Sequence, residues 1–180
     1  VLLMIFAKLS LRTRVSFEAG MAQMGGHAIF YDLGSSPWGA GKESVADTAR
    51  SSTRMVDAVM ARLYAHEDLV EFAKHSQVPV INGLTNFSHP CQALADLLTI
   101  EEYKPQLAGL TACYCGDGHN NVTHSLLFGC TMMGMSVRIA CPPGQEYEPL
   151  PQVLATARSF AEQAGAEVII TRDPKAAADG

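Results

Sequence analysis

Short apolar runs alternate with amphipathic stretches along almost the whole chain, and this alternation constrains the fold more than any other feature. The run VLLMIFA at 1–7 has the length of a buried strand, and the segment 14–25 after it has the length of a helix. Within that helix Val15, Ala19 and Ala22 fall at the spacing of one helix face. Strictly alternating elements of this kind predict parallel β-sheets with helices on both faces.

The same pattern continues to the last residues. Further strands are predicted at 28–32, 57–62, 79–83, 111–115, 136–143 and 167–173. Further helices are predicted at 45–55, 66–76, 89–104, 121–134 and 150–165. Lys104-Pro105 interrupts the alternation, and a second series of elements follows it. We therefore expect an α/β protein of two lobes, 1–104 and 105–180, each with a parallel sheet.

Composition excludes several classes of protein. Thirteen basic and eighteen acidic residues give a formal charge of −5 without blocks of one sign, so we expect no nucleic-acid partner. No apolar run reaches about 18 residues, so we expect no membrane-spanning helix. No carboxylates, histidines or cysteines have metal-ligand spacing, and we expect neither a bound metal nor a cofactor.

The cysteines indicate a reducing compartment. There are five, an odd number, and none forms a CxxC pair. They are Cys91, Cys113, Cys115, Cys130 and Cys141. We interpret them as reduced core thiols of a cytoplasmic protein; Cys113 and Cys115 share one strand face, where small core residues are expected.

Both ends of the chain fall inside predicted elements. Residue 1 already lies in a strand, and DPKAAADG at 173–180 reads as the start of a helix. Chain termini usually lie in exposed segments outside such elements. We therefore expect this chain to be a fragment of a longer protein, with both lobes truncated.

The segment KLSLRT carries the first candidate site. Ligands of open parallel sheets bind at the carboxyl ends of strands, and this segment follows the first strand. Ser10 and Thr13 flank a predicted helix start, where free N–H groups and the helix dipole favour an anion. Arg12 adds a planar fork that matches phosphate oxygens. The alternative is that Ser10 only caps the helix and that Arg12 and Arg14 are solvated.

Two further candidates lie at strand ends. Arg62 closes the predicted strand 57–62, on the side of the first cluster. His89 and Gln92 open a helix three residues apart, so they can face one ligand. An imidazole can donate to a carbonyl oxygen, and a carboxamide can recognise an amide. The alternatives are a surface ion pair for Arg62, a capping histidine and a solvated glutamine.

GDGHNN at 116–121 resembles only part of a dinucleotide fingerprint. Asn121 stands where the third glycine belongs, and the strand 136–143 ends without a ribose-binding acid. A nucleotide site therefore has little support. Asn120 and Asn121 instead offer polar side chains to a ligand between the lobes. The remaining histidines and methionines of this region fit helix and core packing: His119, His124, Met132, Met133 and Met135.

Taken together and in this order, four motifs resemble the aspartate/ornithine carbamoyltransferase family, and within it the ornithine carbamoyltransferases. The motifs are FAKLSLRTRVSFE, GKESVADTAR, HPCQALADLLTI and GDGHNNVTHSLL. The resemblance covers essentially the whole chain. It implies a carbamoyl-phosphate-binding domain over 1–104 and an ornithine-binding domain over 105–180, with carbamoyl phosphate and L-ornithine as substrates.

The resemblance also implies roles for single residues. Ser10, Leu11, Arg12 and Thr13 match the positions that hold the phosphate of carbamoyl phosphate. Leu11 replaces the usual threonine, which costs little if that position acts through its backbone N–H.

The remaining matches lie further along the chain. Arg62 matches the arginine that bridges phosphate and carbonyl oxygen, and His89 and Gln92 match residues that contact the carbonyl oxygen and the carbamoyl nitrogen. Asn121 matches an asparagine that binds the amino acid. Arg62, His89 and Thr13 are thus the expected catalytic groups.

The family also implies an assembly and a complete second site. Its members are usually trimers or assemblies of trimers, and a loop reaches the neighbouring subunit where Ser36 and Trp38 stand here. Later family motifs that complete the ornithine site have no counterpart before Gly180. We therefore expect the full-length protein to be the enzyme, in arginine biosynthesis, and this fragment alone to be inactive.

Several alternatives remain open at this point. The same chemistry could serve another amine, namely aspartate, putrescine or acetylornithine. A non-catalytic nucleotide-binding or regulatory α/β protein, or an inactive gene product, could carry the same fold.

Overall fold

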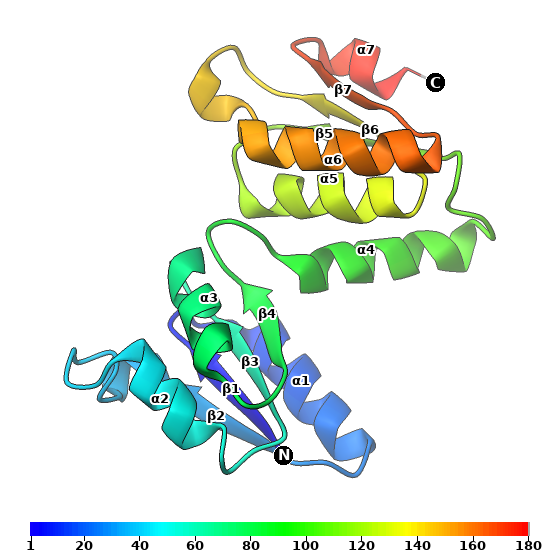
Figure 1. Cartoon of the computed structure of the whole chain (residues 1–180). Helices are drawn as coiled ribbons and strands as arrows, with labels where there is room; N and C mark the ends of the chain where they lie inside the picture. The colour runs from blue at the N-terminus through cyan, green and yellow to red at the C-terminus, as the bar shows by residue number, and fades with distance from the viewer. Residues whose placement is uncertain (180) are drawn as a thin grey trace. The chain divides into compact units, whose positions relative to one another are not determined.

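The computed structural model describes residues 1–179 (Figure 1). The strands are β1 (Leu2–Phe6), β2 (Ala28–Asp32), β3 (Ala58–Arg62), β4 (Val80–Leu84), β5 (Thr111–Cys115), β6 (Ser136–Ala140) and β7 (Val168–Thr171). The α-helices are α1 (Leu11–Gln23), α2 (Val45–Ser52), α3 (His66–His75), α4 (Pro90–Tyr103), α5 (Asn121–Met132), α6 (Pro151–Ala164) and α7 (Pro174–Ala178). Short 3₁₀ turns lie at Leu33–Ser35 and Gln145–Tyr147. No helix among residues 1–179 is long and apolar enough to cross a bilayer.

The chain divides into two compact units. The first runs from Val1 to Phe87 and the second begins at Ser88. Each contains one wholly parallel sheet, of order β2-β1-β3-β4 in the first unit and β5-β6-β7 in the second. The α/β architecture with two parallel sheets, which the alternating pattern predicts, is confirmed.

The first sheet is covered on both faces. Leu3 and Ile5 of β1 point to one face, where they join buried residues of α2 and α3, such as Ala49 and Phe72. Leu2, Met4 and Phe6 point to the other face, against α1. Because β1 is covered on both sides, all five of its residues are buried, as a central parallel strand requires.

The packed face of α1 differs from the one that the periodicity marked. Val15, Ala19 and Ala22 share a face, but that face is exposed. Phe17 and Met21, four residues apart, pack against the sheet instead. The helical spacing was therefore right, but it could not decide between two faces that both carry apolar residues.

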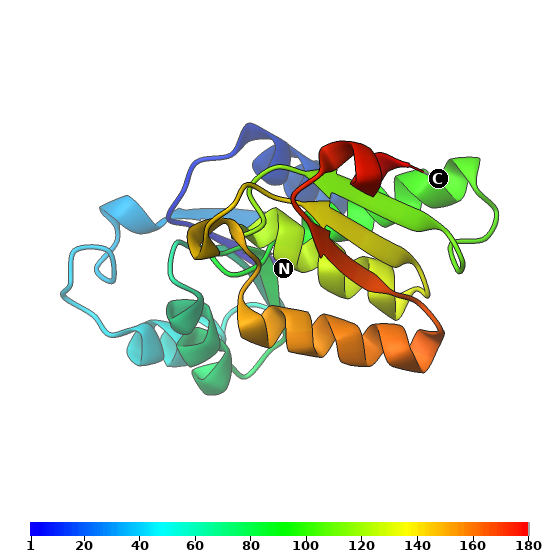
Figure 2. The same ribbon diagram turned by 90° about the horizontal axis from the view of Figure 1, so that it is seen from above.

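The second unit carries helices on both sides of its sheet. In both views α5 and α6 lie on one side and the short α7 lies on the other (Figures 1 and 2). The helix α4 packs against α5, where Gly129 lets Leu97 approach closely. The buried side chains Val137 and Ile139 alternate with Arg138 along β6, so only one face of this central strand is fully apolar.

Two expectations about core residues in this unit were wrong. Cys113 and Cys115 do share a face of β5, but both are exposed on this edge strand. Met132 and Met133 at the end of α5 are also exposed, whereas Met135 is buried. Cys130 and Cys141 are buried as expected, and Cys91 is half-buried.

Candidate functional site

The first turn of α1 is organised by Ser10 and Thr13. Ser10 has extended backbone (φ −160°), and its Oγ accepts a hydrogen bond from Thr13 N at 3.3 Å, which makes it the N-cap. The Ser10 hydroxyl also donates to Thr13 Oγ1 at 3.0 Å. No acidic residue lies in this turn, so the positive end of the helix is not neutralised by the helix itself.

Arg62 reaches this turn from the end of β3. Its Nη1 donates to Thr13 Oγ1 at 3.4 Å. The arginine is only 9% exposed, and its buried Nε has no hydrogen-bond partner. Since Thr13 Oγ1 accepts from both Ser10 and Arg62, the Thr13 hydroxyl hydrogen remains available to donate to a ligand.

A β-bulge sets the position of Arg62 on the sheet. The register between β3 and β4 pairs Ala61 with Asn82 and then Arg62 with Leu84, so Gly83 is the additional residue. A Cβ at Gly83 would collide with the side chain of Met60. Bulges of this kind turn a side chain locally out of the regular alternation, and this one lies beside the proposed anion site.

The charges in this cluster are not balanced. Burial, and secondly the nearby charge of Arg12, hold the pKa of Arg62 below its usual value. Neither Arg12 nor Arg62 forms an ion pair with a carboxylate of the described residues. Two guanidinium groups without a counter-charge, beside a helix N-terminus, form an environment that favours a small anion.

Arg14 is separate from this cluster, although it lies in the same segment. Its Nε donates to Glu18 at 2.9 Å, one turn further along α1. Its guanidinium also lies 3.9 Å from the ring centroid of Phe30 in β2. Arg14 is therefore neither solvated and unpaired nor part of the charge cluster; it attaches α1 to the sheet.

In the second unit, Ser125 connects two of the candidate segments. The backbone N–H of His89 donates to Ser125 Oγ at 2.7 Å, and that hydroxyl donates to the carbonyl oxygen of Asn121 at 2.8 Å. Ser125 is 4% exposed. The start of α4 and the start of α5 are thus joined through one buried hydroxyl. Sequence reasoning missed Ser125, although its position four residues after Asn121 allows this bond within α5.

Gln92 has a defined orientation. Its Nε2 donates to Asp96 Oδ1 at 2.8 Å, one turn further along α4. A carboxylate only accepts hydrogen bonds, so the amide nitrogen must face Asp96. The Gln92 carbonyl oxygen then faces away from Asp96 and can accept a hydrogen bond from an amide N–H of a ligand.

The two asparagines before α5 differ in their roles. The Oδ1 of Asn120 accepts from Val122 N and Thr123 N at 2.9 and 3.0 Å, so this side chain is the N-cap of α5. Its Nδ2 donates to Tyr114 Oη at 3.1 Å. Asn120, expected to face a ligand, is therefore committed to the fold. Asn121 is the first residue of the helix itself.

The segment GDGHNN is closed to a dinucleotide pyrophosphate. The N–H of Gly118 donates to the carbonyl oxygen of Tyr147 at 2.8 Å. A Cβ added at Gly118 would lie 2.6 Å from that oxygen and 2.9 Å from Pro149. In dinucleotide-binding folds the backbone at this turn approaches the phosphates. Here residues 147–149 occupy that space, which argues against the nucleotide-binding alternative.

The loop before α2 packs on its own chain. The Trp38 ring is stacked on the buried Phe72 ring, with centroids 6.0 Å apart. Ser36 is 4% exposed, and its hydroxyl donates to Leu33 O at 2.7 Å and accepts from Gly39 N at 3.0 Å. Both side chains that were considered for contact with a neighbouring subunit are thus held inside the first unit.

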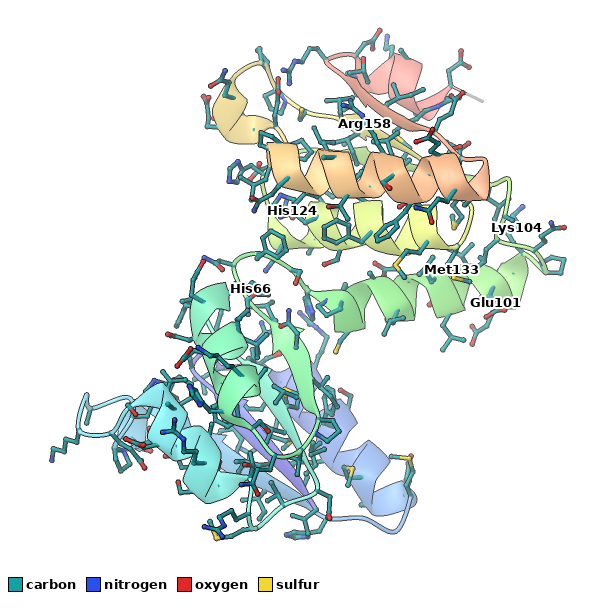
Figure 3. All side chains as sticks on the ribbon, in the orientation of Figure 1. His66, Glu101, Lys104, His124, Met133 and Arg158 are labelled. Carbon is teal, nitrogen blue, oxygen red and sulfur yellow. The ribbon has the colours of Figure 1, made fainter. Side chains whose placement is uncertain are left out.

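The structure groups the candidate residues by unit. Ser10, Arg12, Thr13 and Arg62 come together in the first unit. The second unit holds His89, Gln92 and Asn121, with His124 buried nearby in α5 (Figure 3). Leu11, whose side chain is 80% exposed, offers the α1 terminus only its backbone. Residues 1–179 contain no group of three or more side chains that could hold a metal ion.

Comparison with known protein families gives two matches that divide the chain. Residues 1–102 match the aspartate/ornithine carbamoyltransferase carbamoyl-P binding domain. Residues 108–180 match the aspartate/ornithine carbamoyltransferase Asp/Orn binding domain.

Individual proteins agree with these matches. The chain is 53% identical over 173 residues to the ornithine carbamoyltransferase of Bacillus subtilis, covering 96% of this chain and 53% of that protein. It is similar to the ornithine carbamoyltransferase structure from Pyrococcus furiosus, with a TM-score of 0.92, 48% identity, and coverage of 98% of this chain and 55% of that one. An acetylornithine transcarbamylase complexed with acetylcitrulline is also similar, with a TM-score of 0.88, 32% identity, and coverage of 99% and 61%. The chain spans about half the length of the curated relatives it matches.

Proposed function

Because this chain belongs to the aspartate/ornithine carbamoyltransferase family, we propose that the full-length protein transfers the carbamoyl group of carbamoyl phosphate to the δ-amine of L-ornithine, giving citrulline and phosphate. One observation of the structure carries the proposal most directly. Arg12 and Arg62 lie beside the N-terminus of α1 without a carboxylate partner among residues 1–179, which suits a phosphorylated substrate.

The phosphate would bind to the first turn of α1. Ser10, Leu11, Arg12 and Thr13 would hold its oxygens through hydroxyls, backbone N–H groups and the guanidinium of Arg12. Arg62 would bridge the phosphate and the carbonyl oxygen, for which its Nη1 already lies 3.4 Å from Thr13 Oγ1. A dianion placed here would relieve the repulsion between the two arginines and satisfy the buried Nε of Arg62.

Residues of the second unit would complete the recognition of both substrates. His89 would contact the carbonyl oxygen, and Gln92 would accept a hydrogen bond from the carbamoyl nitrogen. The bond from Gln92 to Asp96 supports this role, since it directs the amide oxygen away from Asp96. Asn121 would bind the amino acid, and Ser125 would link its helix to the backbone of His89.

The reaction would proceed by direct displacement. The uncharged δ-amine attacks the carbonyl carbon, a tetrahedral intermediate forms, and phosphate leaves; no covalent enzyme intermediate is needed. Arg62, Thr13 and His89 stabilise the oxyanion, an effect of about 2.7 to 4 kcal/mol per donor in comparable sites. Ser10, Arg12 and the helix terminus neutralise the leaving phosphate, and alignment of the two substrates lowers the barrier further.

We propose that 1–104 forms the carbamoyl-phosphate-binding domain and 105–180 the ornithine-binding domain. The family matches to residues 1–102 and 108–180 support this division. The helix α4 is a link between the two: it matches the first domain by sequence but packs against α5 of the second compact unit. His89, which directly precedes α4, therefore belongs to the second compact unit.

We further propose that the full-length protein is cytoplasmic, acts in arginine biosynthesis and forms homotrimers or assemblies of trimers. The cysteines support a reducing compartment, since all five are free thiols. Light scattering of the full-length protein tests the assembly. A monomer at working concentration would contradict this part of the proposal.

The acceptor amine needs its own test. The relatives named ornithine carbamoyltransferase favour ornithine, and the acetylornithine transcarbamylase with 32% identity represents one alternative. Initial rates of the full-length enzyme with ornithine, acetylornithine, putrescine and aspartate separate these cases. Ornithine should give the highest kcat/KM; a higher value with another amine would keep the chemistry and replace the substrate.

The anion site is tested with an Arg62→Ala substitution. In the full-length enzyme we expect kcat/KM for carbamoyl phosphate to fall by about 10²- to 10³-fold, because the substitution removes the proposed contacts of the guanidinium to both the phosphate and the oxyanion. The midpoint of urea unfolding of this chain, followed by Trp38 fluorescence, should change little in the variant. This result would show that the first unit still folds.

Arg54→Ala is the matched control for Arg62→Ala, since Arg54 is exposed and makes none of these contacts. Its activity should equal that of the wild type. Unchanged turnover in Arg62→Ala would remove Arg62 from the mechanism.

Binding of NAD rather than phosphonoacetyl-ornithine in calorimetry would favour the nucleotide-binding alternative.

A further inference from the structure

Arg172, the residue directly after β7, holds together the loop between β6 and α6. This loop, residues 141–150, is called here the β6–α6 loop. Arg172 Nη1 donates to Pro142 O at 2.7 Å and to Cys141 Sγ at 2.9 Å, at the start of the loop. Arg172 Nη2 donates to the Glu148 carboxylate, near its end. One side chain thus connects the two ends of a ten-residue connection.

The far end of this loop rests on the segment before α5. Tyr147, next to Glu148, accepts the hydrogen bond from Gly118 N at 2.8 Å. The approach is close, since a Cβ at Gly118 would lie 2.6 Å from Tyr147 O. Asp117 O, one residue earlier, accepts from Thr123 Oγ1 at 3.1 Å in the first turn of α5. The β6–α6 loop therefore contacts the backbone that determines where α5 begins.

The guanidinium group is suited to this task by its shape. Both Arg172 and Glu148 are about two-fifths exposed, so their ion pair alone contributes little to stability. The bonds to Cys141 and Pro142 fix the guanidinium plane, and the second nitrogen is then directed at Glu148. A lysine carries the same charge but cannot present two nitrogens in one plane.

We propose that Arg172 is a positioning residue for the amino-acid side of the site. By holding the β6–α6 loop on Gly118, it fixes the start of α5 and with it Asn121. What Asn121 binds rests on the proposed function, whereas the bonds from Arg172 to Glu148 and from Gly118 to Tyr147 do not. Residue 172 therefore acts on substrate affinity without touching the substrate.

The first experiment measures the contact itself. Amide hydrogen exchange of the ¹⁵N-labelled chain is followed by NMR for the wild type and for Arg172→Met. We expect the Gly118 amide to exchange about tenfold faster in the variant, because Tyr147 O is no longer held in place. The Gly116 amide, which donates to Ala140 O at 2.9 Å, is the internal reference and should not change.

Two further variants complete this experiment. Arg158→Met removes an exposed arginine of α6 (labelled in Figure 3) and should leave the Gly118 amide as in the wild type. Glu148→Ala removes the acceptor of Arg172 Nη2; it is the second variant in case Arg172→Met does not fold, and it should also accelerate exchange at Gly118. Unchanged Gly118 protection in a folded Arg172→Met or Glu148→Ala chain would overturn the proposal.

The second experiment uses the full-length enzyme. Arg172→Met should raise KM for ornithine about three- to tenfold, with kcat and KM for carbamoyl phosphate within about twofold of the wild type. A merely structural role would lower kcat together with the folded fraction and leave KM unchanged, and that result would overturn the proposal. Arg172→Lys should recover only part of the affinity.

The two experiments separate the two proposals. If Gly118 exchange responds but the enzyme does not carbamoylate ornithine, the function is wrong and the contact network stands. If the enzyme carbamoylates ornithine but neither exchange nor KM responds, the role of Arg172 is wrong and the function stands.

Discussion

At the proposed anion site, Leu11 separates the contribution of the backbone from that of the side chains. The family resemblance implies a threonine at this position, and here the leucine side chain is 80% exposed while its backbone begins α1. The free N–H groups of the first turn point along the helix axis whatever the side chain is. The polar contacts that can change affinity belong to Ser10, Thr13 and the two arginines beside them.

Leu11→Thr should therefore leave phosphate affinity nearly unchanged. We expect the Kd of inorganic phosphate, measured by calorimetry, to change by less than about threefold, because a gained exposed hydroxyl contributes little beyond the backbone donors. Ser10→Ala, in contrast, should weaken binding and lower the free energy of unfolding by about 1 kcal/mol through loss of the cap. A large gain of affinity in Leu11→Thr would show that the hydroxyl itself contacts the anion.

At the scale of single elements, the sequence predicts types and order well and the fine roles of residues less well. Every predicted strand and helix is present, because apolar spacing reports which residues are buried. Arg62 lies at the end of β3 and Ser10 at the start of α1, as the sequence predicts. The bulge at Gly83, the bond through Ser125 and the cap at Asn120 were missed, since each depends on contacts between segments that spacing alone does not define.

The cap of α5 gives a prediction at this scale. Asn120→Ala removes the acceptor for two backbone N–H groups, and the free energy of unfolding should fall by about 1 to 2 kcal/mol. Thermal unfolding followed by circular dichroism measures this loss.

Tyr114→Phe is the matched control for Asn120→Ala. It removes only the bond from Asn120 Nδ2 to the phenol and keeps the cap, so it should cost less. Equal losses in the two variants would show that the phenol contact, rather than the cap, carries the stability.

At the scale of the whole molecule, the remaining errors share one cause. Periodicity groups residues by face, but which face is covered depends on the other elements. Val15, Cys113 and Met132 are exposed for this reason, although each lies in a correctly predicted element. The grouping of Arg12 with Arg62, in contrast, follows from the rule that the carboxyl ends of parallel strands meet at one edge of a sheet.

Global stability should fall at alkaline pH because of Cys130. Burial, and secondly the charge of Asp96, raise the pKa of this thiol from 9.0 to about 11. The unfolded chain therefore loses this proton at lower pH than the folded chain. The contribution of Cys130 to the free energy of unfolding is fully present below pH 9.0 and is lost as the pH rises toward 11. The loss amounts to up to about 2 to 3 kcal/mol.

The contribution of Cys130 is isolated by comparison with Cys130→Ala. Urea unfolding of both proteins, below pH 9.0 and near pH 11, gives two differences in the free energy of unfolding. The decrease should be smaller in the variant, because alanine has no proton to lose. Equal decreases would assign the alkaline loss to other groups.

The placement of Trp38 and of the buried thiols gives each unit an optical or chemical label of its own. The chain has a single tryptophan, stacked on Phe72 in the first unit. Cys130 and Cys141, at most 2% exposed, lie in the second unit, whereas Cys113 and Cys115 of the same unit are exposed. The surface thiols can first be blocked with maleimide. The rate at which a second alkylating reagent then modifies Cys130 and Cys141 reports how often the second unit opens. Tryptophan emission reports on the first unit, and neither measurement needs an added dye or tag.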